Sequence, residues 1–251
     1  MCNFNATIRY CLSTNADFVC VKTPAYNGYF QQQFFRDHFE NSPREGVPDR
    51  LTRWFNTGHS LKAGEKTSVC RSDGPSPPVI IKRYNPRGWV NALRQTCGRT
   101  RAVRTWTSAH VLRRIQLATP EPLACVEIKH RGLITESYVV TEYFPGDSLY
   151  LYIAKYWPAE EAWRSIVLKM TGMLELMGQH RVTHGDLKHS NILIHDSDLA
   201  LIDLDALRVH RSRLLFQMRR AKDLKMFKNR LSKCAIKDPP RFDANGAGHS
   251  P

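Results

Sequence analysis

The chain has 251 residues and a formal net charge of +14, with 37 Lys and Arg residues against 23 Asp and Glu residues. This length allows one two-lobed domain or two small domains, and a hydrophobic content of 42% is ordinary for a globular protein. No apolar stretch is long enough to span a bilayer, and the N-terminus lacks the pattern of a secretory signal. A transmembrane or secreted protein is therefore not expected.

Cysteine usage and charge distribution narrow the class further. The seven cysteines include no Cys-x-x-Cys pair, which favours reduced thiols in a cytosolic protein over a metal site. No acidic residue occurs between Asp73 and Glu121, and a second basic run follows Asp205. Such patches favour an anionic partner: nucleic acid, an anionic membrane or a multiply phosphorylated substrate. The alternative is a solvated basic face that only aids solubility.

The N-terminal part of the chain predicts few elements. Residues 1–49 show weak periodicity, and we expect them to form an extension that packs on the main domain. Residues 58–71 predict two strands joined by a tight turn. After a Pro-rich loop at 72–78, the apolar segment 79–84 predicts a buried strand that carries Lys82.

Helical and strand patterns then alternate along the chain. Apolar residues recur at helical spacing over 101–115, which predicts a helix. Residues 123–127 and 137–141 predict paired strands with a turn at 129–132 between them. The segment 142–148 contains Pro-Gly, breaks the sheet and is interpreted as a hinge.

Two long helices are expected in the C-terminal half. The first begins at Pro158, with Glu160 and Glu161 in its first turn, where the helix dipole favours acids. Its apolar stripe is interpreted as core: Ala162, Ile166, Met170, Met173, Leu174 and Met177. Residues 214–231 predict a basic amphipathic helix with the apolar face Leu215, Met218, Leu224, Phe227 and Leu231. The tail 237–251 is expected to be disordered.

The strongest functional motif lies between these helices and reads HGDLKHSN over residues 184–191. Asp186 can accept a proton from an attacking hydroxyl, and Lys188 can neutralise charge on a transferred phosphoryl group. Asn191 and Asp203 offer the oxygen ligands that Mg²⁺ prefers. Single aspartates often only cap turns or end strands, but four such roles at this spacing favour phosphoryl transfer.

The segment after this motif predicts how the two metal ligands meet. Residues 192–194 and 199–202 are short apolar strands, and residues 195–198 read as a turn. A hairpin of these strands would bring Asn191 and Asp203 to one metal ion.

The order of elements resembles the protein-kinase-like fold. The resemblance implies an α+β, two-lobed fold, with a small antiparallel-sheet N-lobe over 50–143 and a truncated, mainly helical C-lobe over 144–236. It also implies that Lys82 holds the α- and β-phosphates of ATP, with Mg²⁺ as the metal. The Glu142 carbonyl and the Phe144 N–H would meet the adenine edge.

Within that superfamily the chain resembles the lipopolysaccharide core kinases, which phosphorylate heptose or Kdo. The resemblance covers residues 55–232 and is carried by the Lys-Arg-Tyr strand, Arg101 with Trp106, Thr-Pro-x-Pro at 119–122, His-Gly-Asp and Ile-Asp-Leu-Asp. It implies ATP-dependent phosphorylation of a sugar hydroxyl in an anionic glycolipid. It further implies a cytoplasmic protein, peripheral at the inner face of the inner membrane, with no nucleic-acid partner and no transmembrane segment.

Three departures from the protein-kinase pattern matter. The helix after Lys82 has no Glu, so this lysine needs another partner, either Asp203 or the nucleotide. Asp203-Leu204-Asp205 lacks the Gly of Asp-Phe-Gly, and the glycine-rich loop is reduced to Gly58 and Gly64. Only 46 residues follow Asp205, with no Ala-Pro-Glu, which suits a small or sugar acceptor better than a peptide.

Two alternatives stay open. An aminoglycoside- or choline-type kinase shares His-Gly-Asp but commonly has a second His where this chain has Lys188, and a cationic substrate suits the basic chain poorly. A pseudokinase or basic binding module is the non-enzyme alternative. The intact Asp186, Asn191 and Asp203 set speaks against it, and no nucleic-acid motif is visible.

Overall fold

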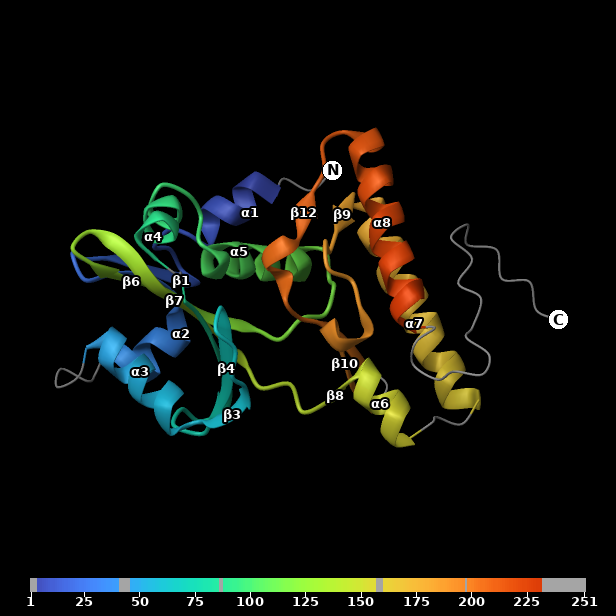
Figure 1. Cartoon of the computed structure of the whole chain (residues 1–251), viewed down its shortest axis with the longest axis horizontal. Helices are drawn as coiled ribbons and strands as arrows, with labels where there is room; N and C mark the ends of the chain where they lie inside the picture. Colours follow the sequence, from blue (N-terminus) through green and yellow to red (C-terminus); the bar gives the residue numbers. More distant parts are fainter. Residues whose placement is uncertain (1–3, 41–45, 86–87, 157–159, 197, 232–251) are drawn as a thin grey trace. The chain divides into compact units, whose positions relative to one another are not determined.

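The structure is a computed structural model that describes residues 4–40, 46–85, 88–156, 160–196 and 198–231. The expected disordered tail and the expected helix start at Pro158 lie outside the described residues. The chain divides into two compact units, which are treated separately (Figure 1). Unit 1 comprises Met1–Phe144 and Asp203–Leu207, and unit 2 comprises Pro145–Ile202 and Arg208–Pro251.

Unit 1 is built on an antiparallel sheet of seven strands in the order β1-β2-β6-β7-β5-β4-β3. Its strands are β1 Phe18–Lys22, β2 Tyr26–Gln31, β3 His59–Lys62, β4 Thr67–Ser72, β5 Val79–Tyr84, β6 Pro122–His130 and β7 Leu133–Glu142. Its helical segments are α1 Phe4–Tyr10, α2 Gln32–Phe35, the π-helical η1 Arg36–Glu40, α3 Val47–Thr57, α4 Gly88–Thr96, α5 Arg101–Arg114 and the 3₁₀ turn η3 Leu204–Ala206. The strands predicted over 58–71, 79–84, 123–127 and 137–141 and the helix over 101–115 are confirmed.

Helices cover both faces of this sheet (Figure 1). On one face, Val79 and Ile81 of β5 pack in a cluster with Leu51 and Trp54 of α3. On the other face, Tyr84 of β5 packs in a second cluster with residues of α5. Because side chains alternate along a strand, Lys82 shares the α5 face with Tyr84.

Residues 18–31, within the segment expected to be an N-terminal extension, form β1 and β2 of the same sheet. Strand β2 pairs with β6 over Tyr26–Phe30, and its Asn27 donates to Glu127 Oε2 at 3.0 Å. Apolar and polar residues alternate only weakly here, and β1 buries only Phe18, so the sequence does not predict these strands. Their position depends on pairing with a strand about a hundred residues downstream.

Unit 2 is mainly helical and carries two small sheets. Its helical segments are α6 Leu149–Tyr156, α7 Glu160–Gln179, the 3₁₀ turn η2 His189–Asn191 and α8 Arg213–Leu231. Its strands are β8 Asp147–Ser148, β9 Val182–Thr183, β10 Ile192–His195, β11 Asp198–Leu201 and β12 Arg208–Val209. The predicted hairpin is confirmed, with Ile192 opposite Leu201 and His195 opposite Asp198. These strands and helices complete the α+β class expected from the sequence.

The buried stripe of α7 is close to the predicted one, because Ile166, Met170, Met173 and Met177 are buried. The predicted apolar face of α8 is partly wrong. Phe227 is buried as expected, together with Phe216 and Asp223, whereas Leu215 and Met218 are 45% and 65% exposed. No helix in the described part of the chain is both long and apolar enough to cross a bilayer.

Candidate active site

The lysine of β5 is paired with the first aspartate of Asp-Leu-Asp. Lys82 Nζ lies 2.6 Å from Asp203 Oδ1, and both side chains are largely shielded from solvent, at 18% and 30% exposure. Both residues belong to unit 1. Of the two partners expected for Lys82, the structure shows Asp203.

This environment keeps Lys82 positively charged. Burial alone would lower the pKa of the ammonium group, but the Tyr84 oxygen and the Asp203 and Asp205 carboxylates outweigh it, so the pKa of Lys82 is raised. The Lys82 ammonium also lies 5.1 Å from the centre of the Tyr84 ring, within the range of a cation–π contact. The side chain is therefore a fixed cation at neutral pH.

The second aspartate of Asp-Leu-Asp is held by the first residue of α5. Arg101 Nε lies 2.5 Å from Asp205 Oδ2, and Arg101 Nη1 donates to Thr67 Oγ1 at 3.1 Å. The Arg101 guanidinium also lies 4.9 Å from the Tyr84 ring centre. We call Lys82, Tyr84, Arg101, Asp203 and Asp205 the lysine cluster.

Backbone geometry places these groups. Thr100 caps α5, because its hydroxyl accepts the Val103 N–H at 3.1 Å, and it donates to Glu127 Oε1 at 2.8 Å. Asp203 adopts a left-handed backbone conformation, with φ 62° and ψ 53°. Such a conformation costs about 1–3 kcal/mol in a residue other than glycine and is typical of functional sites.

In unit 2, Asp186, Lys188 and Asn191 form what we call the aspartate cluster. Lys188 Nζ lies 2.7 Å from Asp186 Oδ2, and Asn191 Nδ2 donates to Asp186 Oδ2 at 3.2 Å and to its backbone carbonyl at 2.9 Å. Gly185 has φ +83°, a conformation that a side chain would strain, so the turn before Asp186 needs glycine. Lys188 and Asn191 thus converge on one oxygen of the Asp186 carboxylate.

The hairpin links this cluster to the chain that precedes Asp203. The Ile202 N–H donates to the Asn191 carbonyl at 3.0 Å, and His184 Nε2 lies 3.0 Å from the Ile202 carbonyl. The Asn191 amide nitrogen faces Asp186, and its Oδ1 takes no hydrogen bond within the described ranges. Amide and carboxylate oxygens, the types that Asn191 and Asp203 offer, are ligands that Mg²⁺ prefers.

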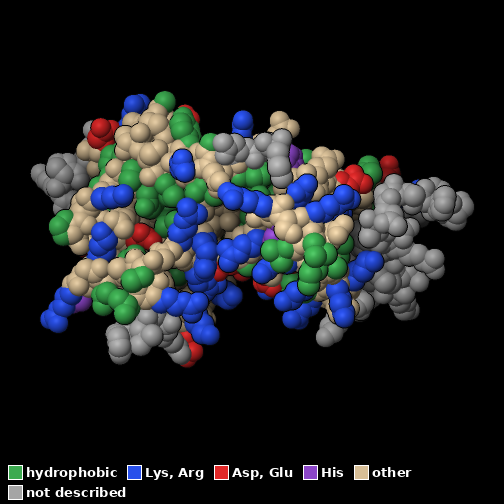
Figure 2. Space-filling model, turned by 90° about the horizontal axis from the view of Figure 1, so that it is seen from above, with side chains coloured by type: hydrophobic (Ala, Val, Ile, Leu, Met, Phe, Trp, Pro, Cys, Tyr) green, Lys and Arg blue, Asp and Glu red, His purple; other side chains and the backbone are tan. Residues whose placement is uncertain are grey.

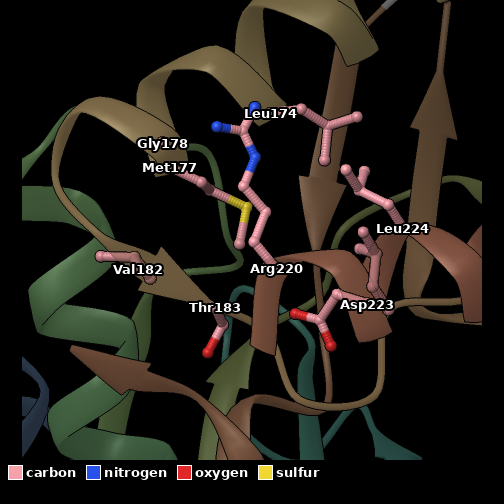
Figure 3. Close-up of a pocket in the computed structure, with 9 residues that line it drawn as sticks. Leu174, Met177, Gly178, Val182, Thr183, Arg220, Asp223 and Leu224 are labelled. Carbon is pink, nitrogen blue, oxygen red and sulfur yellow. The ribbon is translucent and has the colours of Figure 1, made fainter. Parts of the chain in front are cut away.

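A residue of α8 holds the start of the loop. Asp223, 5% exposed, accepts the His184 N–H at 2.8 Å and the Gly185 N–H at 3.1 Å on each carboxylate oxygen. Figure 3 shows Asp223 beside Thr183, at the border of a small pocket between α7 and α8. The cavity measures about 10 Å³, room for one water at most, so it is a packing defect and not a ligand site.

The expected adenine contacts lie at the end of β7, in unit 1. Glu142 is exposed and opposes Val79 of β5, and its N–H donates to the Glu121 carbonyl at 2.9 Å. The next residue, Tyr143, donates its N–H to the Pro78 carbonyl at 3.2 Å. Phe144 is half-buried.

The predicted residues thus fall into two groups, each assembled within its own unit. Sequence reasoning gave no positioning role to three residues: Arg101, Asp205 and Asp223. Each had a visible signal, because Arg101 and Asp205 lie in motifs that carry the family resemblance and Asp223 is the one acid in the basic sequence 208–231.

Comparison with solved structures defines the class. The chain is similar to a structure described as WaaP in complex with acyl carrier protein, with a TM-score of 0.57 and 18% sequence identity, over 80% of this chain and 79% of that chain. This likeness confirms the protein-kinase-like α+β fold expected from the sequence. A model of the lipopolysaccharide kinase (Kdo/WaaP) family matches residues 86–243. The chain therefore belongs to the lipopolysaccharide kinase (Kdo/WaaP) family. No sequence among curated proteins matches it.

The Arg101–Asp205 pair makes a testable prediction. We expect Arg101→Met and Asp205→Asn each to raise the KM for ATP more than they lower kcat, since both loosen the lysine cluster. A double-mutant cycle on kcat/KM for ATP should give a coupling energy between the two residues of roughly 0.5–3 kcal/mol. Arg113→Met is the matched control, because Arg113 lies on the same helix and pairs with Glu121. Additive effects of the two variants would refute the coupling.

Proposed function

We propose that the chain transfers the γ-phosphoryl group of ATP to a sugar hydroxyl, of heptose or Kdo, in the lipopolysaccharide inner core. The aspartate cluster carries this proposal, because it holds one Asp186 oxygen between a cation and an amide donor. A carboxylate in this setting can orient and deprotonate an acceptor hydroxyl. Membership of the lipopolysaccharide kinase family supports the choice of acceptor.

In the proposed step, Asp186 takes the proton of the acceptor hydroxyl and ADP is the leaving group. The acceptor oxygen attacks the γ-phosphorus of ATP while its proton passes to Asp186, and the bond from the γ-phosphorus to the bridging oxygen breaks. ADP leaves with that oxygen. Lys188, whose Nζ lies 2.7 Å from Asp186 Oδ2, neutralises charge on the phosphoryl group during transfer.

The nucleotide and its metal would be held by the remaining residues. Lys82 would bind the α- and β-phosphates, and the Glu142 carbonyl and Phe144 N–H would contact adenine. Asn191 and Asp203 would hold Mg²⁺, which supplies charge neutralisation on the phosphates. Bound nucleotide and metal would replace the Lys82–Asp203 pair with contacts to phosphate and Mg²⁺, so neither side chain would become an unpaired buried charge.

The charge of the protein supports an anionic acceptor. In each unit, Lys and Arg side chains are spread over the side seen in Figure 2, and Asp and Glu are few there. We propose that these basic side chains contact the anionic glycolipid and the inner, cytoplasmic face of the inner membrane. A cationic acceptor such as an aminoglycoside would be repelled.

Phosphoryl transfer to isolated core oligosaccharide tests the proposal. We expect the purified protein with Mg·ATP to add one phosphate group to dephosphorylated core oligosaccharide, detected by mass spectrometry. Core oligosaccharide from cells that lack the protein should lack the same phosphate, and expression of the wild type should restore it. A protein that binds Mg·ATP but phosphorylates no heptose- or Kdo-containing acceptor would overturn the assignment.

A further inference from the structure

Helix α8 presents hydrophobic side chains to solvent on the side opposite its packed face. Phe216, Asp223 and Phe227 are 6%, 5% and 2% exposed, whereas Leu214 and Met218 are 69% and 65% exposed. At 3.6 residues per turn, positions 214 and 218 point nearly the same way, about half a turn from positions 216, 223 and 227. The exposed residues therefore form a second face of the helix and are not core residues exposed by fraying of the helix end.

This outer face continues from apolar to basic along the helix. We define the outer face of α8 as Leu214, Leu215, Met218, Lys222 and Lys225, all of which are exposed. Further exposed cations flank it: Arg211, Arg213 and Arg219. The one acid in residues 208–231, Asp223, is buried on the opposite side, so no negative charge offsets these cations along the helix.

Hydrogen bonds hold the start of α8, and with it this face, in place within unit 2. The Ser212 hydroxyl accepts the Leu215 N–H at 3.3 Å, which caps the start of the helix. Arg181 Nη1 donates to the Arg211 carbonyl at 2.9 Å, and the His210 N–H donates to the Arg181 carbonyl at 2.9 Å. The helix also lies beside α7 (Figure 1). The first turn of α8 cannot rotate inward to bury its leucines without breaking these bonds.

We propose that the outer face of α8 docks on an anionic lipid bilayer, with Leu214, Leu215 and Met218 inserted at the level of the headgroups. A small apolar patch ringed by Lys and Arg on one helix is the composition of an interfacial helix. The cations match the negative surface of anionic lipids, and their aliphatic stems can lie along the apolar boundary. Charge complementarity thus selects a lipid surface over a second copy of this basic chain, which would be repelled.

Docking at this face would set the height of the aspartate cluster above the lipid. Asp223 lies on the opposite side of the same helix, about 7 Å along the axis from Met218, and holds His184 and Gly185 of the loop. The loop would then stand about one helix diameter, roughly 10 Å, from the lipid plane. That height suits a sugar of a glycolipid headgroup and excludes the acyl chains. In this respect the inference rests on the proposed function.

Vesicle co-sedimentation of the full chain tests the proposal without nucleotide or acceptor. We expect binding to vesicles of phosphatidylglycerol and phosphatidylcholine, and none to phosphatidylcholine alone. The double variant Leu214→Gln/Met218→Gln should bind the anionic vesicles at least about tenfold more weakly. Leu168→Gln on α7 is the matched control, because Leu168 is 74% exposed and should bind like the wild type. Gln has nearly the helix propensity of Leu, so thermal melting should show that all variants fold.

Salt dependence distinguishes insertion into the bilayer from purely electrostatic binding, and the oligomeric state tests whether a second copy of the chain covers this face. If the leucines insert, part of the binding persists at 1 M NaCl, where the screening length falls to about 3 Å. Two binding results would overturn the proposal: no wild-type binding to anionic vesicles, or an equal loss of binding in the Leu168→Gln control. A third is a double variant that self-associates less than the wild type but binds anionic vesicles equally well, because the face would then pair two copies of the chain. Phosphoryl transfer to detached core oligosaccharide needs no bilayer, so failure of the proposed function is measured separately.

Discussion

Replacement of Asp186 by Asn is expected to lower kcat roughly 10²–10⁴-fold, which is the usual contribution of a positioned general base. The amide keeps the shape of the side chain and can still accept the Asn191 N–H, but it cannot take a proton from the acceptor hydroxyl. It also loses the ion pair with Lys188 at 2.7 Å. The KM for ATP should change little, because the lysine cluster belongs to the other unit. Steady-state kinetics with core oligosaccharide as acceptor provides both values.

A matched variant in the neighbouring turn controls for this substitution. Asp196→Asn makes the same chemical change ten residues away by sequence, at a side chain that is 92% exposed. Asn tolerates the positive φ of 56° at this position, so folding and activity should match the wild type. If Asp186→Asn and Asp196→Asn turned over equally fast, Asp186 would not be the base.

Loss of the Asp223 carboxylate should have the second largest effect, although Asp223 touches no reacting atom. In Asp223→Asn, one acceptor oxygen is replaced by an NH₂ donor that faces the His184 and Gly185 N–H groups. Leaving a buried amide without its partner costs about 1–3 kcal/mol. We expect a melting temperature lower by about 2–4 °C for each kcal/mol, and a kcat lower by roughly 10²-fold as the loop shifts.

Hydrogen exchange distinguishes a positioning role from general destabilisation. In Asp223→Asn the His184 and Gly185 amides should exchange faster, while amides of the seven-stranded sheet in unit 1 keep their protection. Asp198→Asn is the control, because Asp198 is 83% exposed and pairs with Lys169 on the surface. Unchanged exchange at residues 184 and 185 would show that Asp223 does not hold the loop.

Local patterns predicted the elements that bear the proposed chemistry. The hairpin β10–β11 could be predicted because apolar runs of three and four residues, 192–194 and 199–202, flank a polar turn and need no distant partner. The aspartate cluster spans six residues, from Asp186 to Asn191, so the sequence alone places its members near one another. Helix α5 and strand β5 have periodic or continuous apolar patterns that indicate their burial.

Elements that depend on distant pairing could not be predicted in the same way. Strands β1 and β2 belong to the sheet only because β2 pairs with β6, and the sequence of β1 shows little alternation. The sequence predicted Leu215 on the packed face of α8, whereas the structure buries the next residue, Phe216. The error arises because the apolar residues of this turn lie on two faces of the helix. Only packing within unit 2 decides that Phe216 and Asp223 face inward, the first beside the His210 ring and the second toward the loop N–H groups.

The sequence by itself determined which groups are proposed for phosphoryl transfer, because residue type and close spacing suggested a base, cations and oxygen ligands. The tertiary structure decided their partners: Lys82 meets Asp203 across 121 positions, Arg101 meets Asp205 across 104, and Asp223 reaches back 39 to His184. Such pairs follow from how the strands and helices pack. Local propensity does not specify that packing, because burial of whole faces determines which distant side chains meet.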